Sequence, residues 1–73
     1  MPLAFAPHNI AVTITAVRAE DKVKKHLTAL GLSEGERITL LSSQSGSVIV
    51  AVKEGRLCLD CSLASKISVA VVA

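Results

Sequence analysis

Aromatic side chains are almost absent from this chain of 73 residues, which has no Trp, no Tyr and one Phe, Phe5. Proteins that stack the bases of single-stranded nucleic acids need aromatic platforms and a dense positive track, whereas the net charge here is only +2. Grooves for proline-rich peptides are lined by aromatic residues as well. The composition therefore argues against both kinds of binding, and it predicts a mostly aliphatic core.

Long hydrophobic runs are also missing, although 51% of the residues are hydrophobic. The longest wholly apolar runs, 48–52 and 69–73, hold five residues each, while a membrane-spanning helix needs about 20. The N-terminal stretch has no basic charge and is interrupted by Pro2 and Pro7, so no secretory signal is expected. We therefore expect a cytoplasmic protein without a membrane span, folded as one domain over residues 1–73.

No set of residues with the pattern of an active site stands out. The glycines are isolated, so there is no GxxxxGK loop to hold phosphates. No Ser, His and acid combination indicates nucleophilic catalysis, and Asp60 has no carboxylate nearby in the sequence. A chain this short buries only about 60% of the surface that its unfolded form exposes, which leaves little room for a large cleft. We predict that the protein is not an enzyme.

A first strand is predicted at residues 10–18, where apolar and polar side chains alternate with the period of a half-buried strand. Val12, Ile14 and Ala16 form its predicted inner face. The β-branched residues of this segment suit a pleated, half-buried surface. The strand is therefore expected to cover one side of the core.

A helix is predicted next, beginning at Asp21, whose side chain can cap the first free N–H groups. Val23, Leu27 and Leu30 recur at i, i+4 and i+7 and so fall on one side of this helix. Gly31 is expected to end it, because glycine takes the left-handed conformation after a helix without a Cβ penalty. One helix thus follows the first strand.

The second half of the chain predicts four more short strands and a helical turn. In chain order these are residues 38–40, 48–52, 56–60, 61–66 (the helical turn) and 67–71. The polar break at residues 42–46 marks the first two strands as a hairpin. Five short antiparallel strands in so small a chain favour a partly open barrel of SH3-like or OB type, because closure hides sheet edges. The pattern alone does not choose between these two barrels.

The CxxC pair of Cys58 and Cys61 is the sharpest local motif. A zinc site needs two more ligands, for which the chain offers His8, His26 and Asp60. A redox pair should open a helix after a strand, whereas the first cysteine lies inside a predicted strand. We interpret both cysteines as incidental thiols. The alternative is a site for Fe²⁺ or another divalent transition metal, with Cys58, Cys61, His8 and His26 as candidate ligands.

Basic residues gather on and near the predicted helix. Lys22, Lys24 and Lys25 lie within it, and Arg18 and Arg37 lie on either side of it in the sequence. Together they can form a patch for an acidic partner surface, although basic residues on a helix are often simply solvated. We take Lys22, Lys24, Lys25 and Arg37 as the candidate partner surface.

Residues 27–38, with the sequence LTALGLSEGERI, resemble the signature of the FeoA family, the small cytosolic component of bacterial ferrous iron uptake. Further segments agree in order and spacing and extend the resemblance over essentially the whole chain, namely residues 2–7, 20–22, 48–52, 55–57 and 63–69. The family often has Pro where Glu34 stands, commonly a small or apolar residue at Cys58, and a charged one at Cys61. This comparison supports the interpretation of the cysteines as incidental.

The resemblance implies an SH3-like barrel with the helix inserted after its first strand. It also implies an interaction or regulatory role for FeoB, the membrane iron permease whose own cytosolic domain binds GTP. The protein would then reach the inner membrane only through this partner. The same fold occurs in iron-dependent repressors, which leaves a transition-metal sensor or carrier as the alternative. A third alternative is a metal-independent homo-oligomer formed through an exposed edge strand.

Overall fold

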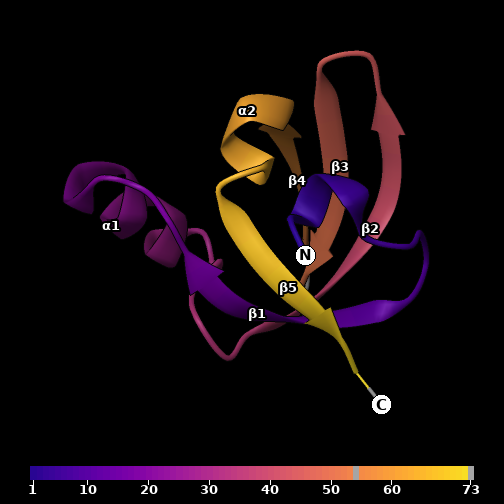
Figure 1. The fold of residues 1–73 in the computed structure, drawn as a ribbon, viewed down its shortest axis with the longest axis horizontal. Helices are drawn as coiled ribbons and strands as arrows, with labels where there is room; N and C mark the ends of the chain where they lie inside the picture. Colours follow the sequence, from indigo (N-terminus) through magenta and orange to yellow (C-terminus); the bar gives the residue numbers. More distant parts are fainter. Residues whose placement is uncertain (54, 73) are drawn as a thin grey trace.

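Five strands form one antiparallel sheet in the order β4-β3-β2-β1-β5 in the computed structural model, which describes residues 1–53 and 55–72. In chain order the elements are η1 (Leu3–Phe5), β1 (Ala11–Val17), α1 (Asp21–Ala29), β2 (Arg37–Gln44), β3 (Ser47–Val52), β4 (Gly55–Asp60), α2 (Cys61–Ala64) and β5 (Ile67–Val71). The sheet curls into an open barrel, and α1 lies to one side of it (Figure 1). The predicted small β-barrel with a helix after its first strand is confirmed.

The core is aliphatic, as predicted. Its buried side chains, all Leu, Ile, Val or Ala in the described chain, come from the strands, both α-helices, η1 and the loops beside them. Leu3, Leu27 and Leu40 are completely buried. The one aromatic residue takes no part, since Phe5 is 78% exposed. The N-terminal turn therefore contributes Leu3 to the core and leaves its phenyl ring in solvent.

β1 departs from strict alternation at a bulge. Val12 and Ile14 are buried as predicted, but the pairing with β5 shifts register between Ile14 and Ala16. Val17 is then the next buried residue, and Ala16 is only half-buried. The expectation that Ala16 continues the inner face is wrong, because an extra residue in one strand reverses the phase of the side chains beyond it.

The first turn of α1 lacks the predicted side-chain cap. Glu20 is the N-cap residue, with extended backbone and no side-chain hydrogen bond at the cap. The Lys24 N–H already donates to the Glu20 carbonyl at 2.8 Å, so Asp21 is the first helical residue. The prediction of Asp21 as the N-cap is therefore wrong by one position, although its carboxylate still lies at the positive end of the helix dipole.

A Schellman motif ends α1, as predicted from Gly31. This glycine has φ +92°; its N–H donates to the Thr28 carbonyl at 3.0 Å, and the Leu32 N–H donates to the Leu27 carbonyl at 2.8 Å. Leu30, which was expected on the apolar side, is 37% exposed. It occupies the C-cap position, and the chain folds back after it so that Leu32 enters the core instead.

The β2–β3 hairpin is longer than predicted. Pairing continues to Gln44 opposite Ser47, which leaves Ser45 and Gly46 as the turn, with Gly46 at φ +86°. The break predicted at residues 42–46 is confirmed for Ser45 and Gly46 and wrong for residues 42–44, which continue the strand. These polar residues remain in the strand because the hairpin tip projects beyond the barrel (Figure 1), where neither face must be apolar.

The last three elements agree with the sequence pattern. In β4, Leu59 is buried and Leu57 half-buried, while the alternate residues are exposed. The Asp60 carboxylate accepts a hydrogen bond from the Ser62 N–H at 3.3 Å and so caps α2. β5 has the predicted bounds, and α2 is shorter than the predicted turn.

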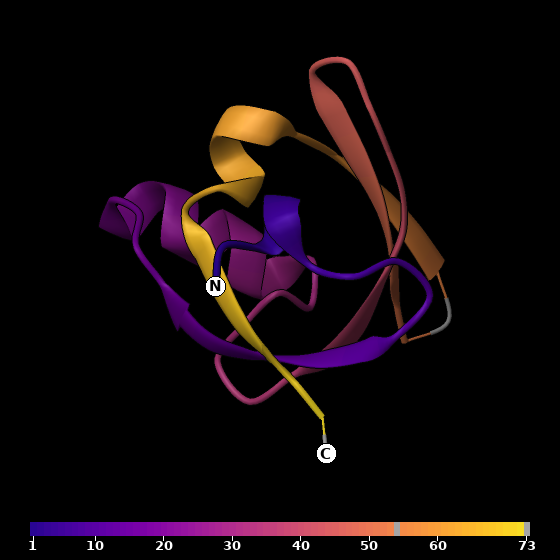
Figure 2. The ribbon, with the colours of Figure 1, turned by 45° about the vertical axis from the view of Figure 1, so that its right-hand side comes forward.

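The two edges of the sheet differ. The Met1 ammonium donates to the Val69 carbonyl at 3.0 Å, and the Val69 N–H donates to the Met1 carbonyl at 2.7 Å. The N-terminal segment therefore lies along the outer edge of β5, and Figure 2 shows this arrangement from a second side. β4, at the other end of the strand order, pairs only with β3. The barrel thus stays open between β4 and β5.

Candidate functional site

The predicted metal ligands do not come together. Strand alternation turns Cys58 outward on β4, whereas Cys61 is half-buried in α2 and packs against the core. His26 is exposed on α1, and His8 lies before β1 with its Nε2 3.4 Å from the Ser43 hydroxyl. Within residues 1–53 and 55–72, no three His, Cys, Asp or Glu side chains are grouped so that they could hold a metal ion. The metal-binding alternative thus gains no ligand set from these residues.

Three lysines do share one element. Lys22, Lys24 and Lys25 are all exposed on α1, because Leu27 and the half-buried Val23 take the positions that face the core. We call the surface formed by these three lysines the α1 basic surface. All three lysines are exposed, and the binding role of the predicted set with Arg37 stays a prediction.

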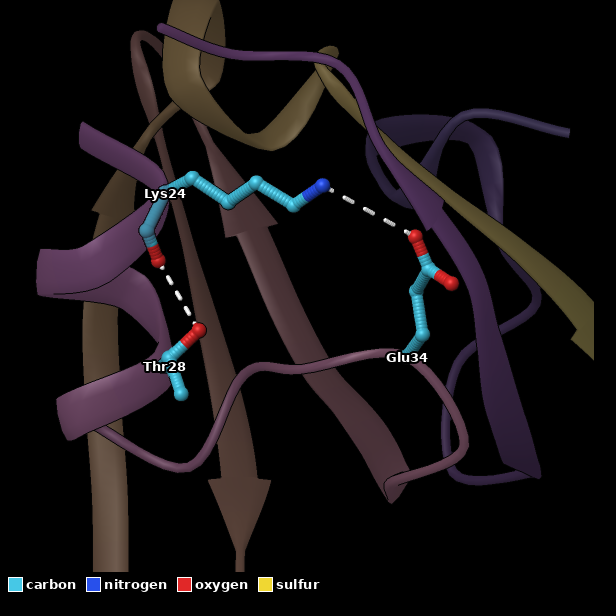
Figure 3. Close-up of polar contacts among 3 residues, drawn as sticks. All are labelled: Lys24, Thr28 and Glu34. Atoms are coloured by element: carbon cyan, nitrogen blue, oxygen red, sulfur yellow. Dashed lines mark hydrogen bonds and ion pairs between the residues drawn. The ribbon is translucent and has the colours of Figure 1, made fainter. Parts of the chain in front are cut away.

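An open hollow of about 350 Å³ lies beside this surface, lined by Asp21, Lys24, Lys25 and Thr28. These positions follow the i, i+3, i+4 and i+7 spacing and so occupy one side of the helix. Figure 3 shows Lys24 extending from α1 toward Glu34 in the loop before β2, with Nζ 4.0 Å from Oε1. Lys24 therefore lines the hollow and reaches toward the loop of Glu34. The Thr28 hydroxyl donates to the Lys24 carbonyl at 2.9 Å, one helical turn earlier.

The Lys24–Glu34 pair is weak and leaves Lys24 available. The two side chains are 47% and 58% exposed, and exposed ion pairs typically contribute less than about 1 kcal/mol. We expect Glu34→Gln to change the free energy of unfolding by less than about 1 kcal/mol, measured by urea denaturation beside Glu36→Gln. A markedly larger loss for Glu34→Gln alone would show that the pair holds α1 in place.

Arg37 lies on a different element from the three lysines. It is the exposed first residue of β2 and pairs with Thr13 of β1. The ion pair found in the described part of the chain joins Lys24 and Glu34 and does not involve Arg37. Arg37 follows the loop of Glu34 in the sequence. Its place in the candidate partner surface, next to the α1 basic surface, stays a prediction.

Phe5 is a surface feature that the sequence pattern did not reveal. A lone Phe is normally buried, yet this one is 78% exposed. Met1, Ile10 and Val71 are also exposed apolar residues, each between 45% and 49%. The exposure of Phe5 follows from η1, a three-residue turn in which only Leu3 is fully buried in the core. No periodicity marks so short a segment, and hence no sequence signal predicted it.

The curled sheet and inserted helix define a small SH3-like barrel domain. Solved structures share this fold, among them two FeoA proteins. The FeoA protein from Chlorobium tepidum has a TM-score of 0.86 and 25% identity, with 100% of this chain and 71% of that chain covered. The FeoA of Stenotrophomonas maltophilia complexed with zinc, described as a prokaryotic SH3 domain protein, has a TM-score of 0.82 and 24% identity, with 96% and 89% covered.

A sequence comparison identifies the family. The family model of the FeoA domain matches residues 1–71, and the chain therefore belongs to the FeoA domain family. Among individual proteins, it is similar to the one named Fe(2+) transport protein A of Methanocaldococcus jannaschii, with 29% identity over 68 residues, which cover 93% of this chain and 83% of that protein. No helix of the described residues is long and apolar enough to cross a membrane.

Proposed function

We propose that this protein is a non-enzymatic accessory protein of ferrous iron uptake, which acts in the cytoplasm on a FeoB-like membrane permease. The observation that carries the proposal is the family match over residues 1–71. The similarity to a protein named for Fe²⁺ transport supports it. In this role the protein affects transport by binding to the permease. The permease itself forms the path across the membrane and carries the GTP-binding domain.

The α1 basic surface is the proposed contact with the cytosolic, GTP-binding part of the permease. Its three lysines are exposed on a helix that lies beside the barrel (Figure 1), and only Leu27 of this helix is fully buried. A partner can therefore reach Lys24 and Lys25 without unfolding the domain. Opposite charges on the partner would speed association and orient the complex. Arg37 would extend the contact onto β2.

Deletion of the gene tests the role in uptake. We expect a strain that lacks this protein to take up radioactive ferrous iron more slowly than the parent strain under anaerobic conditions. The wild-type gene on a plasmid should restore uptake, and an empty plasmid serves as the control. Wild-type uptake in the deletion strain would contradict the proposed function.

A further inference from the structure

β4 presents a regular strand edge that nothing in the described chain pairs with. It bonds only to β3, in a ladder without a register shift. Among residues 1–53 and 55–72, no backbone hydrogen bond outside the sheet and helix ladders involves Gly55–Asp60. Natural edges are often covered, or interrupted by Pro, bulges or charged side chains. β4 has no Pro and no bulge, and its charged residues are one of each sign, Arg56 and Asp60. An edge of this kind is a template for another strand.

The hydrogen-bond phase of β4 identifies which backbone groups are free. The Cys61 N–H donates to the Gly46 carbonyl at 3.0 Å, one step beyond the last β3–β4 pair. In an antiparallel ladder the residues that bond to a given neighbour alternate along the strand. Counting back from Cys61, the residues whose N–H and C=O groups point away from β3 are Asp60, Cys58 and Arg56.

We propose that two copies of this chain associate through β4, as an antiparallel pair with Cys58 opposite the partner's Cys58. In this register each free N–H group of Arg56, Cys58 and Asp60 lies opposite a C=O group of the partner strand, and each free C=O group lies opposite an N–H group. Arg56 lies opposite the partner's Asp60, and by symmetry the same ion pair forms twice. Leu57 lies opposite the partner's Leu59 on the inner face. A second copy of the chain is thus the occupant that this edge fits.

Charge favours this register over the alternatives. Pairs centred on Leu57 or Leu59 would not place Arg56 opposite the partner's Asp60, so neither ion pair would form. A pair centred on Arg56 would place two guanidinium groups opposite each other, and one centred on Asp60 would do the same with two carboxylates. Directly opposed like charges destabilise a strand pair, whereas opposite charges stabilise it. The Asp60 carboxylate caps α2 through Oδ1 and has its second oxygen for the partner's Arg56. The inference is independent of the proposed function, because it uses β4 rather than α1.

Sedimentation equilibrium from micromolar to millimolar concentration tests the pairing. We expect a concentration-dependent dimer whose dissociation constant rises at least about tenfold in Arg56→Glu, since two attractive pairs become repulsive. The swap Arg56→Glu, Asp60→Arg should restore dimerisation, and Asp60→Asn, which retains a capping side chain, should weaken it more mildly. Circular dichroism verifies that each variant is folded. A monomer at all concentrations, or a dimer indifferent to Arg56→Glu, overturns the proposal.

Thiol cross-linking tests the register itself. Bis(maleimido)ethane joins two thiols by adding each across a maleimide double bond and needs no oxidant. We expect this reagent to give a cross-linked dimer with the wild type and with Cys61→Ser. With Cys58→Ser we expect no cross-linked dimer. Cross-links that depend on Cys61 instead would overturn the register. A chain that stays monomeric and instead binds an unrelated extended peptide along β4 would overturn the choice of partner.

Discussion

Replacing Gly31 with Ala is expected to lower the free energy of unfolding by about 2–4 kcal/mol, from the combined cost of a left-handed alanine and of overpacking. Gly31 has φ +92°, and an added Cβ would lie 2.9 Å from Cγ1 of Val52. The residue also closes the end of α1, so its displacement would misplace Leu27 and Leu32, both of which are buried. The total free energy of unfolding of a domain of this size is only about 4–11 kcal/mol.

Gly35→Ala is the matched control for this substitution. Gly35 has nearly the same backbone, with φ +89°, but nothing lies within 4 Å of an added Cβ. Gly35→Ala should lower the free energy of unfolding by only about 1 kcal/mol, the cost of a left-handed alanine. Urea denaturation of both variants measures the difference. Equal losses would show that the contact of Gly31 with Val52 has no energetic weight, and no loss at Gly31 would contradict the account of the helix end.

The double reversal Lys24→Glu, Lys25→Glu is expected to weaken binding to the permease's cytosolic part at least about tenfold. It changes the net charge of the chain from +2 to −2 and places acidic groups along the hollow beside α1. Both side chains are exposed, so the fold should persist. The weakening should be smaller at high salt, because ions screen exposed charges.

The control for the double reversal is Lys53→Glu, Lys66→Glu. It makes the same change in net charge at two exposed positions outside α1. If binding falls equally in both double variants, only the overall charge matters and the α1 basic surface is not a specific contact. If neither variant binds more weakly than the wild type, the lysines have no role in docking.

Local patterns predicted the parts of the fold that depend on neighbouring residues. Gly31 was identified as the helix end because its role depends on the adjacent turn, and β5 was placed correctly by its alternation. The bulge in β1 depends on pairing with a strand more than fifty residues away, which alternation cannot reveal. The extension of β2 has a different cause: polar residues form a strand there because the hairpin projects past the core.

In the candidate site, too, only the features that depend on neighbouring residues were predictable from the sequence. Lys22, Lys24 and Lys25 follow from the helix period, which leaves them outside. The approach of Glu34 to Lys24 depends on the path of the loop after Gly31, and no spacing rule predicts it. The exposure of Phe5 depends on how η1 meets the barrel.

A direct binding measurement tests the proposed contact between this protein and the permease. The purified chain is titrated calorimetrically into the cytosolic, GTP-binding part of the FeoB-like permease from the same organism, at low and at high salt. We expect saturable binding that is weaker at high salt and at least about tenfold weaker for Lys24→Glu, Lys25→Glu. If the folded wild-type chain does not bind at low salt, the proposed contact with the permease is wrong.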